Sequence, residues 1–409
     1  MKSKHLIVPT QYYDPETFQV NHLVSLFLEN GWRVTVIAPF PSYPNKYEFD
    51  GDTGALYEHP RLRICRFPVV LRDGLFLTTI LNSLCFLFFG TILSVYFALR
   101  YPQSHIFAVQ YSPFTCIMPA WAASLLSNAS ASLWIFDLWP QSISAFFGRI
   151  PFRKYVFRSI ESIVCFVYSG FSQIFVSSPS FLSKSPIKFF KGTETLHSWE
   201  PVSRSPRLCG ASIDTSQSLR LISIGNLGSA HNIDLLENLL ISECHANINW
   251  SFVGCGSGIA RLQSFCESHD LTNVTFYGFL PKQDCLALCA QSDLSVVPFR
   301  DSEVSNTICY RFVSSLSVAT PVISFGDNSV SRLVLSSRCG FVLGGSVCDS
   351  SDHISDPFYF ESIPLLMQAL ASQNLSIRSS FRRSAFSLFN SRFSKQAAQS
   401  VLQSLLYPV

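Results

Sequence analysis

The sequence predicts an α/β protein built from two doubly wound domains, because the same alternation of strand and helix begins twice. It begins at Leu6–Pro9, and it begins again at Leu219–Ile224 after a stretch rich in Pro, Ser and Arg that lacks periodicity. A chain of 409 residues is long enough for two cores. We expect an N-terminal domain at 1–200, a linker at 201–218, a second domain at 219–380 and a C-terminal helix at 381–409.

The first domain opens with a strand, a helix and a second strand. The strand Leu6–Pro9 is followed by a helix from Val20 to Asn30 and by the strand Val34–Ile37. Five apolar residues of this helix recur at the spacing of one packed face. They are Val20, Leu23, Val24, Phe27 and Leu28.

Polar residues precede this helix at the edge of the sheet where ligands bind in such folds. Glu16, Thr17 and Asn21 are therefore candidates for ligand contact. The alternative for Glu16 is that it only caps the helix.

The segment 75–99 has 25 residues without a charge and is closed by Arg100. It is long enough to span a bilayer, but a buried helix or a helix in the membrane interface fits the same composition. The flanking strands, at 62–68 and 106–110, are expected in one sheet, which a single span would divide. We therefore favour a helix in the membrane interface.

A basic cluster and one carboxylate follow in the same domain. Arg149, Arg153, Lys154 and Arg158 either form a solvated face or bind anionic head groups or a lipid diphosphate. Asp137 ends the apolar run that starts at Leu133, which is a typical way to present an acid to a ligand.

In the second domain, the strand Leu219–Ile224 ends in Gly225-Asn226-Leu227-Gly228. A glycine turn before a helix start favours anions, because the free N–H groups attract them and no Cβ keeps them away. Four further strands end in Gly, Pro or basic loops that would share one edge of the sheet. They are expected at 249–253, 274–278, 294–297 and 321–323.

Composition narrows the class of protein. A net charge of +3 with 14% charged residues carries no signature of nucleic-acid binding. The 37 Phe residues and the mean hydropathy of +0.26 indicate contact with a membrane surface. The 13 Cys residues form no CxxC pair, which indicates reduced thiols in the cytoplasm and no metal site. We expect no signal peptide and no secretion.

The order of motifs in the second half resembles the donor domain of glycosyltransferase family 4. These motifs are Gly-Asn-Leu-Gly, Val-Gly-x-Gly, Phe-Tyr-Gly-x-x-Pro, Val-Val-Pro-x-Arg and x-Pro-Val-Ile. Three further segments resemble the WbuB-like branch of that family: Tyr12–Leu23, Phe136–Ser142 and Ser305–Ser314. The resemblance implies the GT-B architecture, in which two Rossmann-like domains face each other across a cleft.

The resemblance also implies a function. A sugar would move with retention from a nucleotide donor, most simply a UDP-sugar, to a lipid-linked saccharide at the cytoplasmic face of the inner membrane. This transfer would serve O-antigen or capsule synthesis and would need no metal or cofactor. By analogy, Arg311 would stabilise the leaving diphosphate, with Arg300 as second choice, and the amides of 226–228 would form an anion nest.

Other roles are carried over by position. Asp137, Arg311 and Glu16 are the candidate catalytic residues, and Thr17 and Asn21 would lie on the acceptor side. Tyr277–Leu280 and the Gly254 loop would hold the base, and Ser314 would face the ribose. The full set of candidate donor-binding residues is Gly225, Asn226, Gly228, Gly254, Tyr277, Gly278, Phe279, Leu280, Arg300, Ser305 and Ser314.

The sequence also departs from this family. Many members carry two Glu residues where this chain has Asn306 and Ser314, although Ser at the second position is shared with the WbuB-like branch. Two alternatives therefore stay open. One is a catalytically degenerate, membrane-bound partner of another transferase. The other is a nucleotide-sugar epimerase on the same fold, for which His231 is the one suitably placed histidine. Further differences from the branch are Gln19, Gln141, Ser229, Cys309 and Tyr310.

Overall fold

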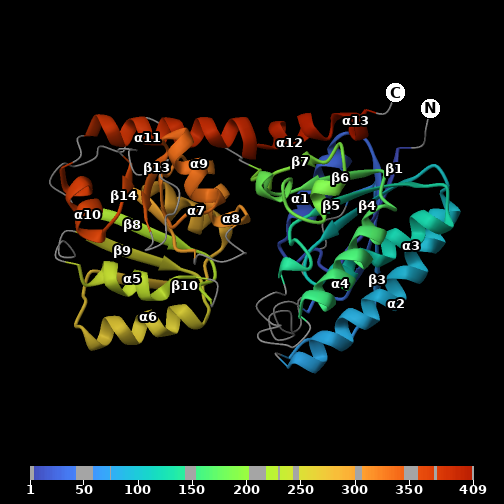
Figure 1. Cartoon of the computed structure of the whole chain (residues 1–409), viewed down its shortest axis with the longest axis horizontal. Coiled ribbons are helices and arrows are strands. Elements are labelled where there is room, and N and C mark those ends of the chain that lie inside the picture. The colour runs from blue at the N-terminus through green and yellow to red at the C-terminus, as the bar shows by residue number, and fades with distance from the viewer. Residues whose placement is uncertain are drawn as a thin grey trace. The chain divides into compact units, whose positions relative to one another are not determined.

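The computed structural model divides the chain into two compact units (Figure 1). Unit 1 comprises Met1–His197 and Ala398–Val409, and unit 2 comprises Ser198–Ala397. The structure describes residues 4–42, 59–73, 75–142, 153–201, 218–228, 231–242, 248–299, 306–344, 358–372 and 375–407. Most of the expected linker lies outside these ranges.

Unit 1 contains a parallel sheet of seven described strands in the order β3-β2-β1-β4-β5-β6-β7. Both faces are covered, so the central strands are largely buried, and every residue of β4 is buried. The expected strands at 6–9, 34–37, 62–68 and 106–110 are all confirmed. The strands are β1 His5–Pro9, β2 Arg33–Pro39, β3 Leu62–Phe67, β4 His105–Gln110, β5 Ser130–Ile135, β6 Gln173–Val176 and β7 Glu194–Thr195.

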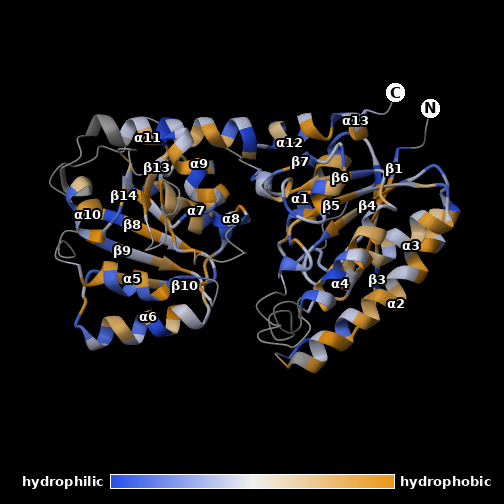
Figure 2. Cartoon of the chain, viewed as in Figure 1, coloured by the Kyte–Doolittle hydropathy of each residue, from blue (hydrophilic) through white to orange (hydrophobic). Residues whose placement is uncertain are grey.

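The helices of unit 1 pack on this sheet as the sequence pattern predicts. The five apolar residues predicted for one face of α1 are buried, which confirms that prediction. Helix α2 coincides with the uncharged segment and is predominantly hydrophobic along its length (Figure 2). Figure 1 shows α2, α3 and α4 on the same side of the sheet. The helices are α1 Gln19–Glu29, α2 Phe76–Arg100, η2 Phe114–Ile117, α3 Met118–Leu126, α4 Arg153–Tyr168, η4 Pro179–Phe181 and η5 Ile187–Phe189.

Unit 2 repeats this strand order. Its described strands form a second parallel sheet ordered β10-β9-β8-β11-β12-β13-β14. The strands expected at 219–224, 249–253, 274–278, 294–297 and 321–323 are confirmed within one residue at their starts. The strands are β8 Leu219–Ile224, β9 Ile248–Val253, β10 Val274–Gly278, β11 Leu294–Val297, β12 Val322–Phe325, β13 Gly340–Leu343 and β14 Tyr359–Phe360.

Helices cover both faces of the second sheet. In Figure 1, α5 and α6 lie on one side of it, and α7, α8, α9 and α11 lie on the other. These helices are α5 Ile233–Leu240, α6 Ser257–Ser268, α7 Lys282–Gln291, α8 Tyr310–Ser317, α9 Ser329–Ser337, α10 Ile363–Ser372 and α11 Leu375–Leu388.

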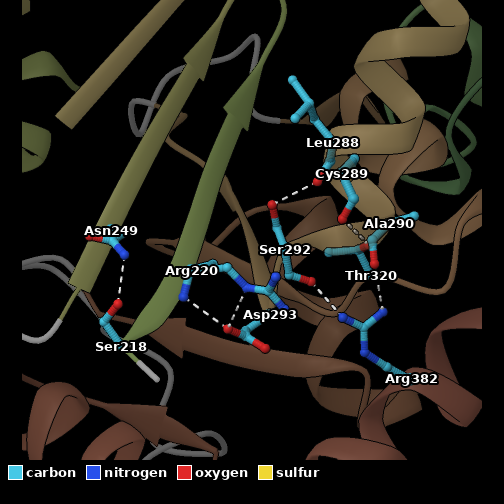
Figure 3. A network of polar contacts seen from close by, with 10 residues as sticks. All are labelled: Ser218, Arg220, Asn249, Leu288, Cys289, Ala290, Ser292, Asp293, Thr320 and Arg382. Atoms are coloured by element: carbon cyan, nitrogen blue, oxygen red, sulfur yellow. Dashed lines mark hydrogen bonds and ion pairs between the residues drawn. The ribbon is translucent and has the colours of Figure 1, made fainter. Parts of the chain in front are cut away.

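A polar network fixes α11 to the edge of this sheet where β8 begins (Figure 3). The Arg382 guanidinium of α11 donates to the carbonyl oxygens of Ala290 and Ser292 at the end of α7, at 3.4 and 2.5 Å. The next residue, Asp293, accepts from the Arg220 amide at 2.8 Å at the start of β8. Carbonyl groups at a helix end have no partner within the helix, so the arginine satisfies them.

The C-terminal region is not the single helix expected for 381–409. Helix α11 passes into a π-helical turn at Phe389–Phe393, and Ser394 is then extended. Two short helices follow, α12 Lys395–Val401 and α13 Gln403–Leu406. The interruption has a packing reason, because Phe389 and Phe393 are buried in unit 2 whereas residues from Ala398 onward belong to unit 1.

Candidate functional site

Three loops meet at the carboxyl edge of the second sheet, after β8, β9 and β10. They stack through main-chain hydrogen bonds. The Gly225 amide donates to the Val253 carbonyl at 2.8 Å, and the Gly254 amide donates to the Gly278 carbonyl at 2.7 Å. The Leu227 amide donates to the Cys255 carbonyl at 2.9 Å. The glycine loops that the sequence predicted at one edge are therefore in direct contact.

The glycines are needed mainly for this stacking. A Cβ on Gly254 would lie 2.4 Å from the Gly225 carbonyl oxygen, and one on Gly256 would lie 2.4 Å from the Leu227 oxygen. Gly225, Gly254 and Gly256 also have positive φ angles of 91, 129 and 112°. At Gly228, in contrast, a Cβ would meet nothing within 4 Å. Loop packing thus explains Gly254 and Gly256 without a ligand, and the positive φ explains Gly225.

Arg311 lies in the first turn of α8, against the first of these loops. Its Nη2 donates to the Asn226 carbonyl at 2.6 Å and would lie 3.6 Å from a Cβ on Gly225. Burial lowers the pKa of the guanidinium, and its Nη1 is buried without a hydrogen-bond partner. Within the described residues, no carboxylate pairs with it. The predicted cation and the predicted glycine loop are thus brought together.

Two of the three amides predicted to form the anion nest already donate hydrogen bonds to groups within the protein, so that expectation needs correction. Of the amides at 226–228, Leu227 donates to Cys255 and Gly228 donates to Nδ1 of His231 at 3.0 Å. Burial and the nearby Arg311 charge lower the pKa of His231 to about 4, and its ring stacks on Phe299. His231 is therefore neutral at pH 7, and it orders the loop.

The residues expected to hold the base surround the end of β10. Phe279 is 84% exposed and Tyr277 is 41% exposed, so both present aromatic surface at this edge. Leu280 instead packs against the apolar cluster of Ile222 and Val253. Of these residues, Tyr277 and Phe279 have the exposure that stacking on a ligand requires.

Ser314 is buried, contrary to the expectation that it faces a ribose. It is 6% exposed, and its hydroxyl lies 3.4 Å from the Glu200 carboxylate. That carboxylate also accepts from the Tyr310 hydroxyl at 2.5 Å and pairs with the Lys282 ammonium at 2.6 Å. This cluster joins the first turns of α7 and α8 to the start of unit 2. Sequence reasoning missed it, since Glu200 is remote in sequence from the other three members.

In unit 1, Asp137 follows β5 at the carboxyl edge of the first sheet. Burial raises the pKa of its carboxyl group, whereas hydrogen bonds from Ser112 lower it. Its carbonyl accepts from the Gln110 side chain at 2.7 Å. The predicted strand therefore does deliver this acid to the edge, in a partly buried position.

Glu16 is not placed as a catalytic group. It is 5% exposed, and its two carboxylate oxygens accept from the amides of Tyr13 at 3.2 Å and Ser42 at 3.0 Å. Nor does it cap α1, whose N-cap is Phe18 without a side-chain bond. Glu16 instead ties the loop after β1 to the segment after β2. Thr17 is exposed, and the Asn21 side chain donates to the Glu16 carbonyl at 2.9 Å.

Several candidates lie outside the described residues, namely Arg300, Ser305, Ser229 and Arg149. Asn306 is described, and its carbonyl accepts from Ser329 at 2.9 Å. In the ranges that the structure describes, no group of three or more His, Cys, Asp or Glu side chains could hold a metal ion.

Solved structures share this architecture over almost the whole chain. Sucrose-phosphate synthase from Thermosynechococcus elongatus matches with a TM-score of 0.67 and 14% identity, covering 98% of this chain and 97% of that one. Anabaena HepE, in complex with UDP and glucose, matches with a TM-score of 0.64 and 12% identity, covering 98% of this chain and 99% of that one. WaaG, a glycosyltransferase involved in lipopolysaccharide biosynthesis, matches with a TM-score of 0.61 and 12% identity, covering 99% of this chain and 100% of that one. The chain has the GT-B fold.

This GT-B chain matches no family model and no curated protein sequence. The expected fold class is confirmed by the two parallel sheets and by these structures. Membership of family 4 and of the WbuB-like branch stays a prediction. On the GT-B framework, the stacked glycine loops and Arg311 lie at the carboxyl edge of the C-terminal sheet, and Asp137 lies at the carboxyl edge of the N-terminal sheet.

Proposed function

We propose that the chain is a retaining glycosyltransferase that uses a nucleotide-sugar donor, specifically a UDP-sugar. The acceptor is a lipid-linked saccharide in surface polysaccharide synthesis, and the enzyme works at the cytoplasmic face of the inner membrane. HepE was solved with UDP and glucose, and WaaG takes part in lipopolysaccharide biosynthesis, which supports both halves of this proposal.

The environment of Arg311 is the observation that carries the donor assignment. Arg311 is half-buried, and a buried Nη1 without a charged partner is costly, because its desolvation is not compensated by an ion pair. Its Nη1 has no acceptor, and the one described acceptor of Nη2 is the neutral Asn226 carbonyl. A diphosphate bound at this loop would supply the missing negative charge. Its oxygens fit the planar guanidinium well.

The chemistry follows from where charge develops. As the bond from the anomeric carbon to the diphosphate breaks, negative charge grows on the departing oxygen. Arg311 stabilises that charge more strongly in the transition state than in the ground state. The acceptor oxygen bonds to the same carbon, and its proton passes to the departing diphosphate. Asp137 would orient the acceptor hydroxyl from unit 1.

The test compares nucleotide binding by the parent chain and by variants at Arg311. We expect UDP and UDP-sugars to raise the melting temperature of the parent. Arg311→Ala should weaken binding about 10²-fold and abolish transfer to lipid acceptors, since one such donor is worth about 3 kcal/mol. Arg332→Ala is the matched control, because that exposed arginine pairs with Asp327 at 2.9 Å and not with one of the three loops. Transfer should persist in the presence of EDTA.

The alternatives predict different outcomes. A degenerate partner would show no hydrolysis or transfer of labelled nucleotide sugars, and Arg311→Ala would leave surface glycan unchanged. If no nucleotide stabilises the chain at millimolar concentration, the donor assignment fails. The epimerase alternative relied on His231, whose Nδ1 accepts from Gly228 and whose pKa of about 4 keeps it neutral.

A further inference from the structure

Helix α2 exposes large apolar side chains on the side that faces away from the core of unit 1. Its outer side bears exposed large apolar side chains at helical spacing, among them Leu84, Phe88 and Ile92, which are 54, 62 and 52% exposed. Its inner side packs on unit 1 and carries both apolar and polar residues, because Phe86 and Phe97 are 1 and 3% exposed and Asn82 and Ser94 are 1 and 0% exposed. The outer side of a surface helix in water is normally polar, so the apolar outer side of α2 is suited to an apolar solvent.

Helices α3 and α4 extend this exposed apolar surface. Leu126 at the end of α3 is 63% exposed, and Ile163 and Phe166 of α4 are 53 and 65% exposed. The Phe166 ring contacts Trp121 of α3 at 5.7 Å, which joins the two helices. We call this surface the apolar docking face, and define it by Leu84, Phe88, Ile92, Leu126, Ile163 and Phe166.

Positive charge lies along one border of this face. Lys154 and Arg158 are exposed one helical turn apart on α4. By helical spacing, these two basic residues lie at one edge of the exposed surface of α4. Phe166 lies away from that edge, on the side of α4 that contacts α3. Across α2, α3 and α4 the one acidic residue is Glu161, which accepts from the Ser185 hydroxyl. Apolar side chains bordered by basic ones fit an anionic bilayer surface.

We propose that the apolar docking face binds an anionic lipid bilayer with α2 lying in the membrane plane instead of crossing it. By length and composition α2 could cross a membrane, and among the described residues it is the one helix that could. Its inner side, however, is buried from Asn82 through Phe86 and Ser94 to Phe97. At Gly90 a Cβ would lie 3.3 Å from Pro119 of α3. A helix packed on its own domain over this length offers only one side to lipid.

This placement also assigns the end from which a lipid-borne acceptor approaches. The N-terminal half of α2 reaches the carboxyl edge of the first sheet, because Gln11, just after β1, donates to Ser83 at 3.3 Å. Asn82 also donates to Ser42, in the segment after β2, at 3.1 Å. Asp137 follows β5 at this same edge. A saccharide carried on a lipid would therefore reach the acceptor edge beside the N-terminal half of α2. This last step rests on the proposed function.

Vesicle binding tests the docking face without donor or acceptor, so its failure would leave the nucleotide assignment intact. The full chain is mixed with phosphatidylcholine vesicles with and without phosphatidylglycerol, and floated on a density gradient. Phe88→Glu with Ile92→Glu should lower binding to both vesicles at least tenfold. Lys154→Ala with Arg158→Ala should lower binding about 25-fold on anionic vesicles alone, since each charge contributes about fivefold.

Leu365→Glu is the matched control, because this leucine is 50% exposed on α10 in unit 2. It replaces one exposed apolar side chain by a glutamate at a similar exposure, and the variant should float like the parent. Circular dichroism and thermal melting establish that every variant is folded. Binding that is unaffected by the Phe88 and Ile92 changes, or equal binding to both vesicles, would overturn the proposal.

Depth measurements separate a helix in the membrane plane from a spanning helix. Tryptophan replaces Leu77, Phe88 or Leu99, all exposed along the outer side of α2, and brominated lipids quench the added fluorescence. In-plane docking predicts equal, shallow depths at the three positions. A spanning helix instead places position 88 deepest, with 77 and 99 near opposite surfaces. That result would refute the in-plane arrangement.

Discussion

The two units share one strand order and differ at their carboxyl edges. In unit 2 the loops after β8, β9 and β10 contain glycine and stack main chain on main chain. In unit 1 the loop after β1 is held by side chains. Glu16 accepts two amides there, and Arg72 donates to the Tyr12 hydroxyl at 2.9 Å. The same topology thus builds one edge from bare backbone and the other from bulky side chains.

This difference indicates that the two sheet edges are suited to different kinds of ligand. An edge made of main chain lets a polyanionic ligand approach closely and meet one fixed cation. An edge made of side chains offers varied polar groups, which suits selection among acceptors. The sheet order is common to both units, so specificity lies in the loops at the strand ends.

The largest expected effect comes from adding a methyl group to the stacked loops. Gly254→Ala should destabilise unit 2 by about 3 kcal/mol or more, because its Cβ would overlap the Gly225 carbonyl at a positive φ. Stabilisation by UDP should be lost as well. Gly228→Ala is the control and should change stability by less than about 1 kcal/mol. If chemical denaturation shows equal losses of stability in Gly254→Ala and Gly228→Ala, loop stacking is not the reason that position 254 requires glycine.

The second prediction concerns pH and one histidine in each unit, the buried His105 and the half-buried His231. Burial lowers the pKa of His105 to about 4, and the pKa of His231 is also about 4. Their unfolded pKa is about 6.5, so the unfolded chain binds more protons below that pH. Stability is therefore full above pH 6.5 and falls as pH drops toward 4, by up to about 3 kcal/mol for His105. In His105→Asn, urea unfolding should show a correspondingly shallower decline.

The third prediction separates the two acids of unit 1. Asp137→Asn should reduce transfer about 10²-fold with little change in melting temperature, as expected for a group that handles the acceptor hydroxyl. Glu16→Gln should lower stability by about 1–2 kcal/mol, since it weakens two bonds to buried amides. Its remaining activity should follow its folded fraction. The interpretation fails if Glu16→Gln abolishes transfer at full stability.

The smallest effect is expected at the edge of unit 2 opposite the loops. Arg382→Ala should lower the stability of unit 2 by about 1–2 kcal/mol, because the carbonyls of Ala290 and Ser292 lose a charged donor. Arg383→Ala, an exposed neighbour on the same helix, is the control. Nucleotide binding should survive in both. A loss of UDP binding in Arg382→Ala would mean that the two edges are coupled.

The sequence was informative wherever local pattern decides structure. Continuous apolar runs ending in glycine marked the strands of unit 2, and helical spacing gave the buried face of α1, because burial on a sheet imposes those periods. Arg311 was singled out by the family resemblance, and the structure places it against the Gly225 loop. The resemblance to GT-B enzymes then agreed with the observed fold.

The features that could not be predicted depend on contacts between distant residues. Nothing local indicates that Glu200 pairs with Lys282, or that Ser314 turns toward that carboxylate. The amides of Leu227 and Gly228 looked free because their acceptors, Cys255 and His231, are defined only once the loops stack. Likewise the two amides that Glu16 binds come from different loops.

The return of residues 398–409 to unit 1 has a practical meaning for dissecting the protein. Gln399 donates to Asn30 at 3.1 Å, and the Trp32 indole donates to the Leu406 carbonyl at 3.2 Å. A gene fragment ending at His197 would therefore lack part of its own unit, whereas 198–397 is contiguous. Expressing the N-terminal half alone would call for grafting the last dozen residues back on, for example by circular permutation.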